Sequence, residues 1–157
     1  MTEKFTFKVN GTERTVECEP ETMLLDILRE TFNLTGTKRG CDNSTCGSCT
    51  VILSGKAVKS CLTSMAKVQG GEVVTVEGLS KGMELHPVQQ ALVDSGAIQC
   101  GFCTPGIATE LVALFDENPD ADEKTVLNAL NKHLCRCTGY EAIKDGAILA
   151  QQLVKKK

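Results

Sequence analysis

The stretch that decides the fold lies at residues 37–49, which read TKRGCDNSTCGSC. Its three cysteines, Cys41, Cys46 and Cys49, follow a C-x4-C-x2-C spacing, and a fourth, Cys61, comes later in the chain. This is the spacing of a plant-type 2Fe-2S loop, in which a later element supplies the fourth thiolate. The stretch therefore predicts an iron–sulfur site.

Two glycines flank these cysteines, Gly40 and Gly47. A flat two-iron cluster needs a backbone wrapped around it with N–H groups aimed at its sulfurs. A residue without a Cβ lets the backbone come close and adopt positive φ, although glycines also punctuate ordinary turns.

A second group of cysteines lies in the C-terminal half, as Cys100-x2-Cys103 and Cys135-x-Cys137. Each pair falls at the edge of an expected helix, and a helical hairpin would bring the two pairs together. Helix N-termini suit a negatively charged group, because their N–H groups lack intrahelical partners and the local dipole is positive. We interpret this group as a second 2Fe-2S site.

Zinc is the alternative for both groups, since four cysteines at short spacings also form zinc sites. The x4-then-x2 spacing disfavours zinc most strongly at the first group. A brown colour and an electron paramagnetic resonance signal on reduction distinguish the two metals. Disulfides are the weaker alternative, because we expect a reducing cytoplasm.

Composition excludes several classes of protein. The 157 residues carry 17 Lys+Arg against 20 Asp+Glu, a net charge of −3, with five Phe, one Tyr and no Trp. A nucleic-acid binder would need a basic stripe and stacking rings. No apolar run approaches the ~18 residues of a membrane span, and the first residues lack the apolar core of a signal peptide, so we expect a cytoplasmic protein without membrane insertion. Cys18, the ninth cysteine, is expected to be a small packed side chain.

The first half of the chain reads as strands and turns around one helix. Phe5, Phe7 and Val9 alternate with polar residues, and Asn10-Gly11 offers the turn of a two-residue hairpin. Apolar residues recur at helical spacing from 22 to 32. The hairpin partner and the later short strands are expected at residues 12–18, 50–53, 56–60 and 73–76.

The second half reads as four helices with short connections, which suggests a bundle. Helices are expected from Pro87 to about residue 94, from about Pro105 to 118, and after the possible capping boxes Asp120/Glu123 and Thr138/Glu141. Residues 77–82 read as a linker. The sequence thus predicts two domains, at residues 1–78 and 79–157.

Together these motifs resemble the small iron–sulfur subunit of the molybdenum hydroxylases, the xanthine dehydrogenase and aldehyde oxidoreductase family. The resemblance covers roughly residues 5–153. Its most specific segments are TKRGC at 37–41 with CGSC at 46–49, QCGFCTPG at 99–106, and LCRCTGY at 134–140.

The resemblance implies an α+β fold, with an N-terminal ferredoxin-like β-grasp domain followed by a C-terminal four-helix-bundle 2Fe-2S domain. It implies that Gln99 hydrogen-bonds the molybdenum-pterin cofactor of a large subunit, with Cys137 the cluster ligand closest to it. The implied metal ligands are Cys41, Cys46, Cys49 and Cys61 for the ferredoxin-like cluster, and Cys100, Cys103, Cys135 and Cys137 for the buried cluster beside that cofactor.

The implied function is single-electron transfer from the molybdenum-pterin centre through two 2Fe-2S clusters to a flavin subunit or another acceptor, with no substrate-converting site on this chain. FAD is expected on a separate subunit, because Gly70-Gly71 lacks the context of a dinucleotide-binding loop. The implied assembly is a heterotrimer of small, large and FAD subunits that can dimerise. The competing interpretation is a freestanding ferredoxin-type carrier, which would need only one cluster.

Two positions depart from the pattern of the family. Ser44 stands where relatives usually have glycine, so it must tolerate that backbone conformation. His133 stands where asparagine is frequent, and it offers the second cluster a hydrogen bond or a positive charge.

Overall fold

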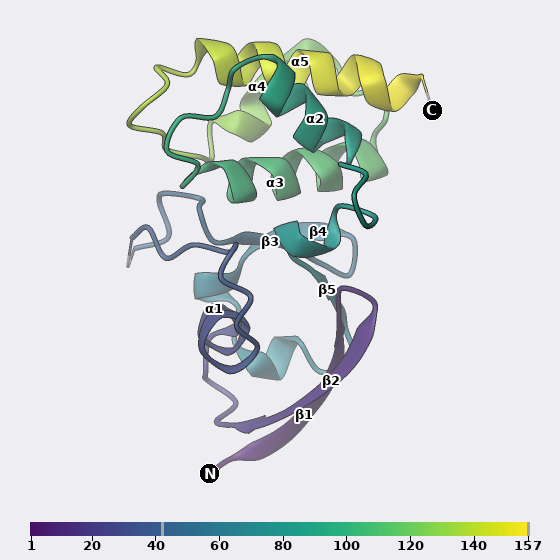
Figure 1. Ribbon diagram of the computed structural model, residues 1–157. Coiled ribbons are helices and arrows are strands. Elements are labelled where there is room, and N and C mark those ends of the chain that lie inside the picture. The colour runs from purple at the N-terminus through teal and green to yellow at the C-terminus, as the bar shows by residue number, and fades with distance from the viewer. Residues whose placement is uncertain (42, 157) are drawn as a thin grey trace.

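The computed structural model describes residues 1–41 and 43–156, with a sheet-rich half and a helical half (Figure 1). In those residues, five strands form one sheet in the order β2-β1-β5-β3-β4. The β1–β5 pair is parallel and the other neighbours are antiparallel. The strands are β1 (Glu3–Val9), β2 (Thr12–Cys18), β3 (Thr50–Leu53), β4 (Lys56–Lys59) and β5 (Glu72–Val74).

The expected hairpin is confirmed. β1 and β2 pair in a register that places Phe5 opposite Val16, and the chain turns at Asn10 and Gly11, which both have positive φ. Phe5 and Phe7 are buried on the face of the sheet that packs its own core. The alternation of apolar and polar residues in β1 therefore predicted correctly which side chains face the core.

The helix expected at residues 22–32 is only partly correct. The structure has a single α-turn, α1 (Leu24–Asp26), followed directly by a π-helix at Ile27–Thr31. The N–H of Phe32 bonds to the carbonyl of Ile27, five residues back, at 3.0 Å. An apolar repeat of three to four residues fits both kinds of helix, so the sequence pattern could not separate them.

Arg29 in this π-turn fastens the start of the cysteine-rich loop. Its Nη1 donates to the carbonyl of Thr35 at 3.0 Å and to that of Thr37 at 2.7 Å. A bond from a charged donor is stronger than a neutral one. The wide turn thus connects a packed element directly to the loop of the first cysteine group.

The four expected helices of the second half are present. His86 caps the first of them: its Nδ1 accepts from the N–H of Val88, while Gln89 accepts from the N–H of His86. The helices are α2 (Pro87–Asp94), α3 (Thr104–Glu117), α4 (Glu123–Leu130) and α5 (Glu141–Lys155).

Both expected capping boxes in this half are wrong. Asp122, not Asp120, caps α4 and accepts from the N–H of Thr125 at 2.8 Å. At α5 the residue before the helix is Tyr140 with φ of 74°, and no side chain caps it. The Thr138 hydroxyl is instead turned toward Cys135, 3.1 Å from its sulfur.

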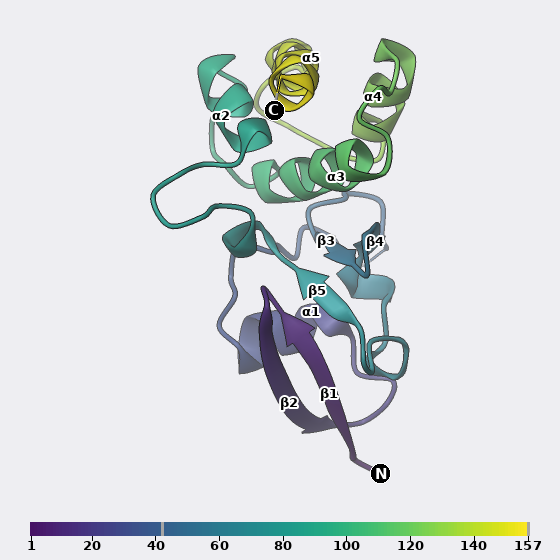
Figure 2. The ribbon, with the colours of Figure 1, turned by 90° about the vertical axis from the view of Figure 1, so that its right-hand side faces the viewer.

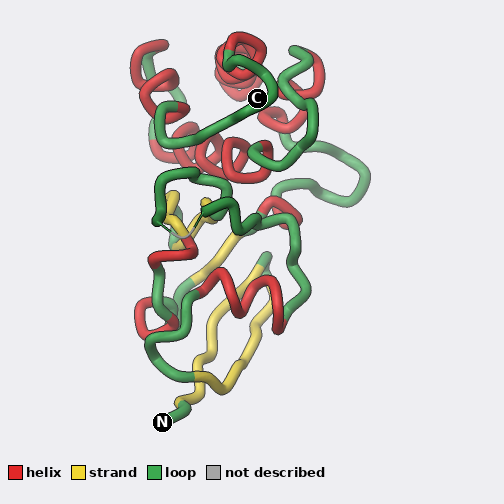
Figure 3. Tube along the Cα trace, turned by 90° about the vertical axis from the view of Figure 1, so that its left-hand side faces the viewer, coloured by secondary structure: helices red, strands yellow, loops and turns green. Residues whose placement is uncertain are grey.

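Each half has its own apolar cluster, and the two meet at α3. Figure 2 shows α3 lying between β3 and β4 below and α2, α4 and α5 above, and Figure 3 shows loops between the helices and the strands. Ile52 of β3 belongs to the apolar cluster of the helices, as does Leu79. The expected linker at 77–82 therefore begins as a packed segment, with a 3-10 turn at Val76–Gly78.

The contact between α3 and the first half depends on small and polar groups. The hydroxyl of Thr109 donates to the carbonyl of Thr50 in β3 at 2.8 Å, at a buried position. A Cβ placed on Gly106 would lie 2.4 Å from the carbonyl oxygen of Gly47. Only a residue without a side chain lets the two backbones approach this closely.

Within residues 1–41 and 43–156, no helix has the length and apolarity needed to cross a bilayer.

Candidate metal centres

The first cysteine group comes together where the loop before β3 meets the segment after β4. Cys49 is 2% exposed and Cys46 is also buried, while Cys41 and Cys61 are half-buried. The thiols approach each other in pairs, Cys41 with Cys46 and Cys49 with Cys61. The structure thus brings together all four residues predicted for this site.

Backbone N–H groups point at the sulfur of Cys41. Those of Cys46 and Asn43 lower the pKa of this thiol to about 6, because they stabilise the thiolate. Burial, together with the neighbouring Cys49, raises the pKa of Cys61 to about 12. Amides aimed at sulfur are the arrangement that an anionic iron–sulfur cluster needs.

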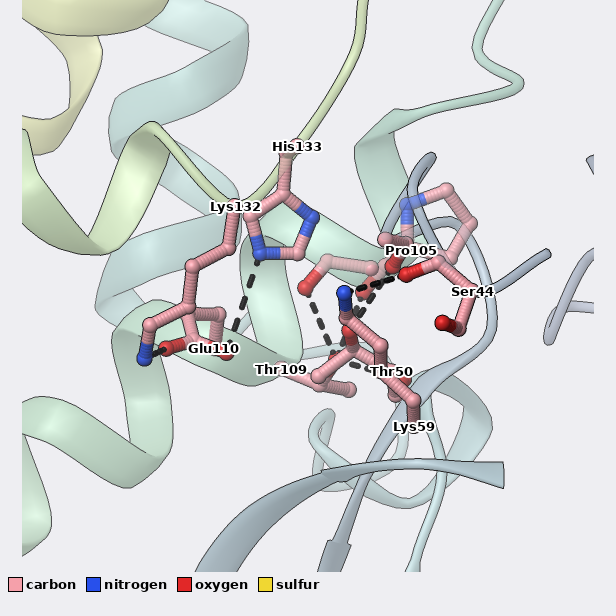
Figure 4. A network of polar contacts seen from close by, with 10 residues as sticks. Ser44, Thr50, Lys59, Pro105, Thr109, Glu110, Lys132 and His133 are labelled. Atoms are coloured by element: carbon pink, nitrogen blue, oxygen red, sulfur yellow. Dashed lines mark hydrogen bonds and ion pairs between the residues drawn. The ribbon is translucent and has the colours of Figure 1, made fainter. Parts of the chain in front are cut away.

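Ser44, at the tip of this loop, adopts the left-handed conformation expected for a glycine position, with φ of 63°. Lys59 donates its ammonium to the carbonyl oxygen of Ser44 (Figure 4). The side chain from β4 therefore supports a strained residue of the loop, and the departure from glycine is tolerated.

Changing Ser44→Gly should stabilise the loop. The left-handed conformation costs a residue with a Cβ about 1–2 kcal/mol, part of which is offset by the greater unfolded-state freedom of glycine. The expected result is a free energy of unfolding higher by roughly 0.5–1 kcal/mol, with slower bleaching of the cluster under a chelator. Ser54→Gly is the matched control, since Ser54 also has positive φ but lies in the β3–β4 turn. Faster bleaching of Ser44→Gly than of the control would contradict this account.

The second cysteine group gathers at the N-terminus of α3. Cys103 is the residue that precedes α3, Cys100 lies between α2 and α3, and Cys135 and Cys137 lie in the connection from α4 to α5. The thiols again approach in pairs, Cys103 with Cys135 and Cys100 with Cys137. All four line one cavity of about 350 Å³.

The two pairs of this site differ in exposure. Cys103 is buried, and burial with the neighbouring Cys135 raises its pKa to about 12. Burial acts to raise the pKa of Cys135. Hydrogen bonds from the hydroxyl and the N–H of Thr138 outweigh this effect, and the pKa is lowered. Cys100 and Cys137 are exposed. On this chain the site therefore has one covered side and one open side.

The pairwise grouping fits a two-iron cluster. Each iron of such a cluster takes two cysteine thiolates, whereas a structural zinc site draws four around one ion. The donor sets therefore suit 2Fe-2S clusters better than the zinc alternative.

One hydrogen bond joins the two sites. The N–H of Leu134, the neighbour of Cys135, donates to the carbonyl of Cys46 at 2.9 Å. Next to this bond, Gly47 packs so closely that a Cβ on it would lie 2.4 Å from the carbonyl oxygen of Lys132. The close backbone approach predicted for Gly47 is therefore confirmed, and the neighbour that requires it is the second half of the chain. At Gly40, a Cβ would lie 2.9 Å from the sulfur of Cys46.

Comparison with known proteins agrees with this geometry. Residues 7–80 match the 2Fe-2S iron-sulfur cluster binding domain, and residues 75–148 match the 2Fe-2S binding domain. The nicotinate dehydrogenase small FeS subunit of Eubacterium barkeri is 41% identical over 132 residues, which are 84% of this chain and 84% of that subunit. The chain belongs to the small iron–sulfur subunits of the molybdenum hydroxylase family.

Solved structures and a longer relative extend this similarity. A chain of quinoline 2-oxidoreductase from Pseudomonas putida 86 superposes with a TM-score of 0.90 and 38% identity, covering 99% of this subunit and 97% of that chain. The aldehyde oxidoreductase of Megalodesulfovibrio gigas is 41% identical over 152 residues. The matched segment covers 95% of this subunit but only 17% of that longer protein.

The small subunit also holds a charged cluster that the sequence did not reveal. Glu110 of α3 is 6% exposed; Lys132 Nζ lies 2.5 Å from its Oε1 and His133 Nε2 lies 3.7 Å from its Oε2 (Figure 4). Burial acts to raise the pKa of Glu110, but His133 and Lys132 outweigh it and lower the pKa. The feature of the sequence that could have indicated this cluster is the position of Glu110 among the apolar residues of α3.

Three further candidate residues, His133, Gln99 and Cys18, lie in different surroundings. His133 is buried and faces Glu110 with Nε2 and Gly47 with Nδ1. Gln99 is exposed beside Cys100, and Cys18 packs against the apolar cluster of the sheet, where burial raises its pKa. The packing expected for Cys18 is therefore confirmed.

Proposed function

We propose that this chain is the electron-transfer subunit of a multi-subunit molybdenum hydroxylase. It would take electrons from a molybdenum-pterin centre on a large subunit and deliver them to an FAD subunit or another acceptor. The observation that carries the proposal is the presence of two paired cysteine sites joined by the hydrogen bond from Leu134 to Cys46. A freestanding carrier would need only one site.

The proposed ligands are the two sets of four cysteines already described. Cys41, Cys46, Cys49 and Cys61 would hold the first cluster, and Cys100, Cys103, Cys135 and Cys137 the second. When bound, a 2Fe-2S cluster takes up and releases one electron at a time. The chain's own N–H groups, and the Thr138 hydroxyl at Cys135, would stabilise the thiolates.

We assign the finer architecture by the same reasoning. A β-grasp domain at residues 1–78 would hold the first cluster, and a four-helix bundle at 79–157 the second. The support is the presence of two apolar clusters, one within the sheet and one among the helices that also includes Ile52 of β3. The two domains share an interface at α3, as the buried bond from Thr109 to Thr50 indicates.

The open side of the second site is the proposed contact with the large subunit. Cys100 and Cys137 are exposed there, with Phe102 (44% exposed) and Leu134 (54% exposed) beside them. Exposed apolar groups around a site commonly mark a protein interface. Gln99, also exposed, would hydrogen-bond the pterin cofactor across this contact, with Cys137 the ligand nearest to it.

The first site would face the electron acceptor. Leu62, directly after Cys61, is 59% exposed, and Cys41 and Cys61 are less deeply buried than Cys46 and Cys49. The heterotrimer with large and FAD subunits, and the dimer that it can form, are part of this proposal and are based on the family.

Purification of the native complex tests the function. We expect this chain to co-purify with a molybdenum-containing chain and a flavin chain, and both clusters to be bleached under anaerobic conditions by a substrate whose C–H bond is hydroxylated. The substrate classes to be tested are purines, nicotinate, aldehydes, carbon monoxide and aromatic acyl-CoA esters. A chain that purifies without partners, and whose clusters no such substrate reduces, would instead be a freestanding carrier.

A further inference from the structure

Glu110 is a buried carboxylate that is not among the proposed cluster ligands. Its neighbours along α3, such as Ile107 and Leu111, are apolar and buried. Taking a carboxylate out of water costs several kcal/mol unless partners compensate. An apolar residue would fill this position at least as stably, so the choice of a carboxylate needs another reason.

The partners of Glu110 both come from a single turn, Lys132-His133. Each carboxylate oxygen faces one of them: Oε1 lies 2.5 Å from Lys132 Nζ, and Oε2 lies 3.7 Å from His133 Nε2. The contact with His133 is an ion-pair distance and not a hydrogen bond, and within residues 1–41 and 43–156 neither nitrogen of the buried His133 ring has a hydrogen-bond partner. The carboxylate therefore faces both side chains of this turn from the side of α3, while the N–H groups of the turn bond to Ala129 and Leu130 at the end of α4.

The opposite side of the same turn rests on the loop of the first site. The ideal Cβ position of Gly47 is 2.4 Å from Lys132 O and 2.6 Å from His133 Nδ1, so no side chain separates the two backbones. The turn is thus held between Glu110 on one side and Gly47 on the other. The next residue, Leu134, makes the hydrogen bond to Cys46 that joins the two sites.

We propose that Glu110 is a positioning residue for electron transfer between the two clusters. It clamps Lys132 and His133 against Gly47 and thereby holds the N–H of Leu134 on the carbonyl of Cys46. This inference rests on the proposed function, because it needs a cluster at each site. A carboxylate supplies what an apolar side chain lacks, namely a hydrogen-bonded ion pair with Lys132 and a charged oxygen that faces His133.

The test uses the purified complex with variants of this chain. Glu110→Met fills the same space without polar contacts, and Glu110→Gln keeps the shape and one acceptor oxygen. Lys132→Met removes the other partner of the ion pair, at a side chain that is 58% exposed. Glu117→Gln is the matched control, since it removes the same charge from an exposed position of α3.

Two measurements report on the coupling between the clusters and not on stability alone. One is the magnetic splitting between the clusters in the electron paramagnetic resonance spectrum after full reduction with dithionite. The other is the rate of electron exchange between them after one-electron reduction by a photogenerated deazaflavin radical. We expect both to decrease in the order wild type, Glu110→Gln, Glu110→Met, with the rate in Glu110→Met and Lys132→Met lower by on the order of tenfold to a hundredfold.

The possible outcomes separate this inference from the proposed function. If the wild-type chain lacks two clusters, the proposed function fails. If it has two coupled clusters and Lys132→Met retains the full splitting and rate, the clamp is overturned, even where Glu110→Met does not fold. An effect of Glu117→Gln equal to that of Glu110→Gln would also overturn it, since a general effect of charge would then suffice.

Discussion

Replacing Cys103 with alanine is expected to remove the cluster of the second site and leave the first intact. Cys103 is the most buried thiol of its group and lies at the start of α3, beside its partner Cys135. Without it one iron would have only one cysteine ligand, and a cluster needs four. We expect the variant to hold half of the wild-type iron and to show one electron paramagnetic resonance signal on reduction.

The reciprocal change separates the two sites. Cys49→Ala should remove the other half of the iron and the other signal, because Cys49 and Cys61 form a pair at the first site. Cys18→Ala is the control, since Cys18 packs against the apolar cluster of the sheet and belongs to neither site. Full iron content in Cys103→Ala, or loss of iron in Cys18→Ala, would show that the ligands are wrongly assigned.

Replacing Gly106 with alanine is expected to disturb both sites with a single methyl group. The added Cβ would lie 2.4 Å from Gly47 O and 3.1 Å from Ser48 Cα, and both are backbone atoms that no rotamer change can move aside. Overpacking of this kind typically costs 1–3 kcal/mol and, with rigid backbone on both sides, about 3 kcal/mol or more is expected here. The measurement is denaturant unfolding of the loaded chain, together with its iron content.

A matched glycine in another helix provides the control. A Cβ on Gly146 of α5 would meet Ser95 Oγ at 2.5 Å and Leu92 Cδ2 at 3.1 Å, which are both side-chain atoms. Rotation of these groups can relieve the contact, and alanine is favoured over glycine inside a helix by roughly 0.5–1 kcal/mol. Gly146→Ala should therefore change stability by about 1 kcal/mol or less. Equal losses of unfolding free energy in Gly106→Ala and Gly146→Ala would contradict the claim that α3 needs a residue without a side chain at its contact with Gly47.

The sequence predicted those features that depend on local pattern. The spacing of Cys41, Cys46 and Cys49 identified a loop site, and the structure brings Cys61 to it as expected. The hairpin and the four helices followed from apolar periodicity and from residues such as Asn10, Gly11 and Pro87. These patterns extend over only a few residues, so a single sequence is enough to recognise them.

The features that were missed depend on competition between local and distant partners. Asp120 and Asp122 are both suitable caps for α4, and only the three-dimensional path of the chain selects Asp122. Thr138 was assigned to a cap because no sequence pattern shows that Cys135 attracts its hydroxyl. The role of Glu110 was not predicted, because its partners Lys132 and His133 lie more than twenty residues further along the chain.

The bond from Leu134 to Cys46 also bears on how the protein is made. Chains emerge from the ribosome N-terminus first, at about 5–20 residues per second. The loop at residues 37–49 is therefore exposed to the cell for several seconds before the residues that complete its packing, from Gly106 to Leu134, have been synthesised. The first site thus becomes fully enclosed only after Gly106 and Leu134 have been synthesised and have folded against it.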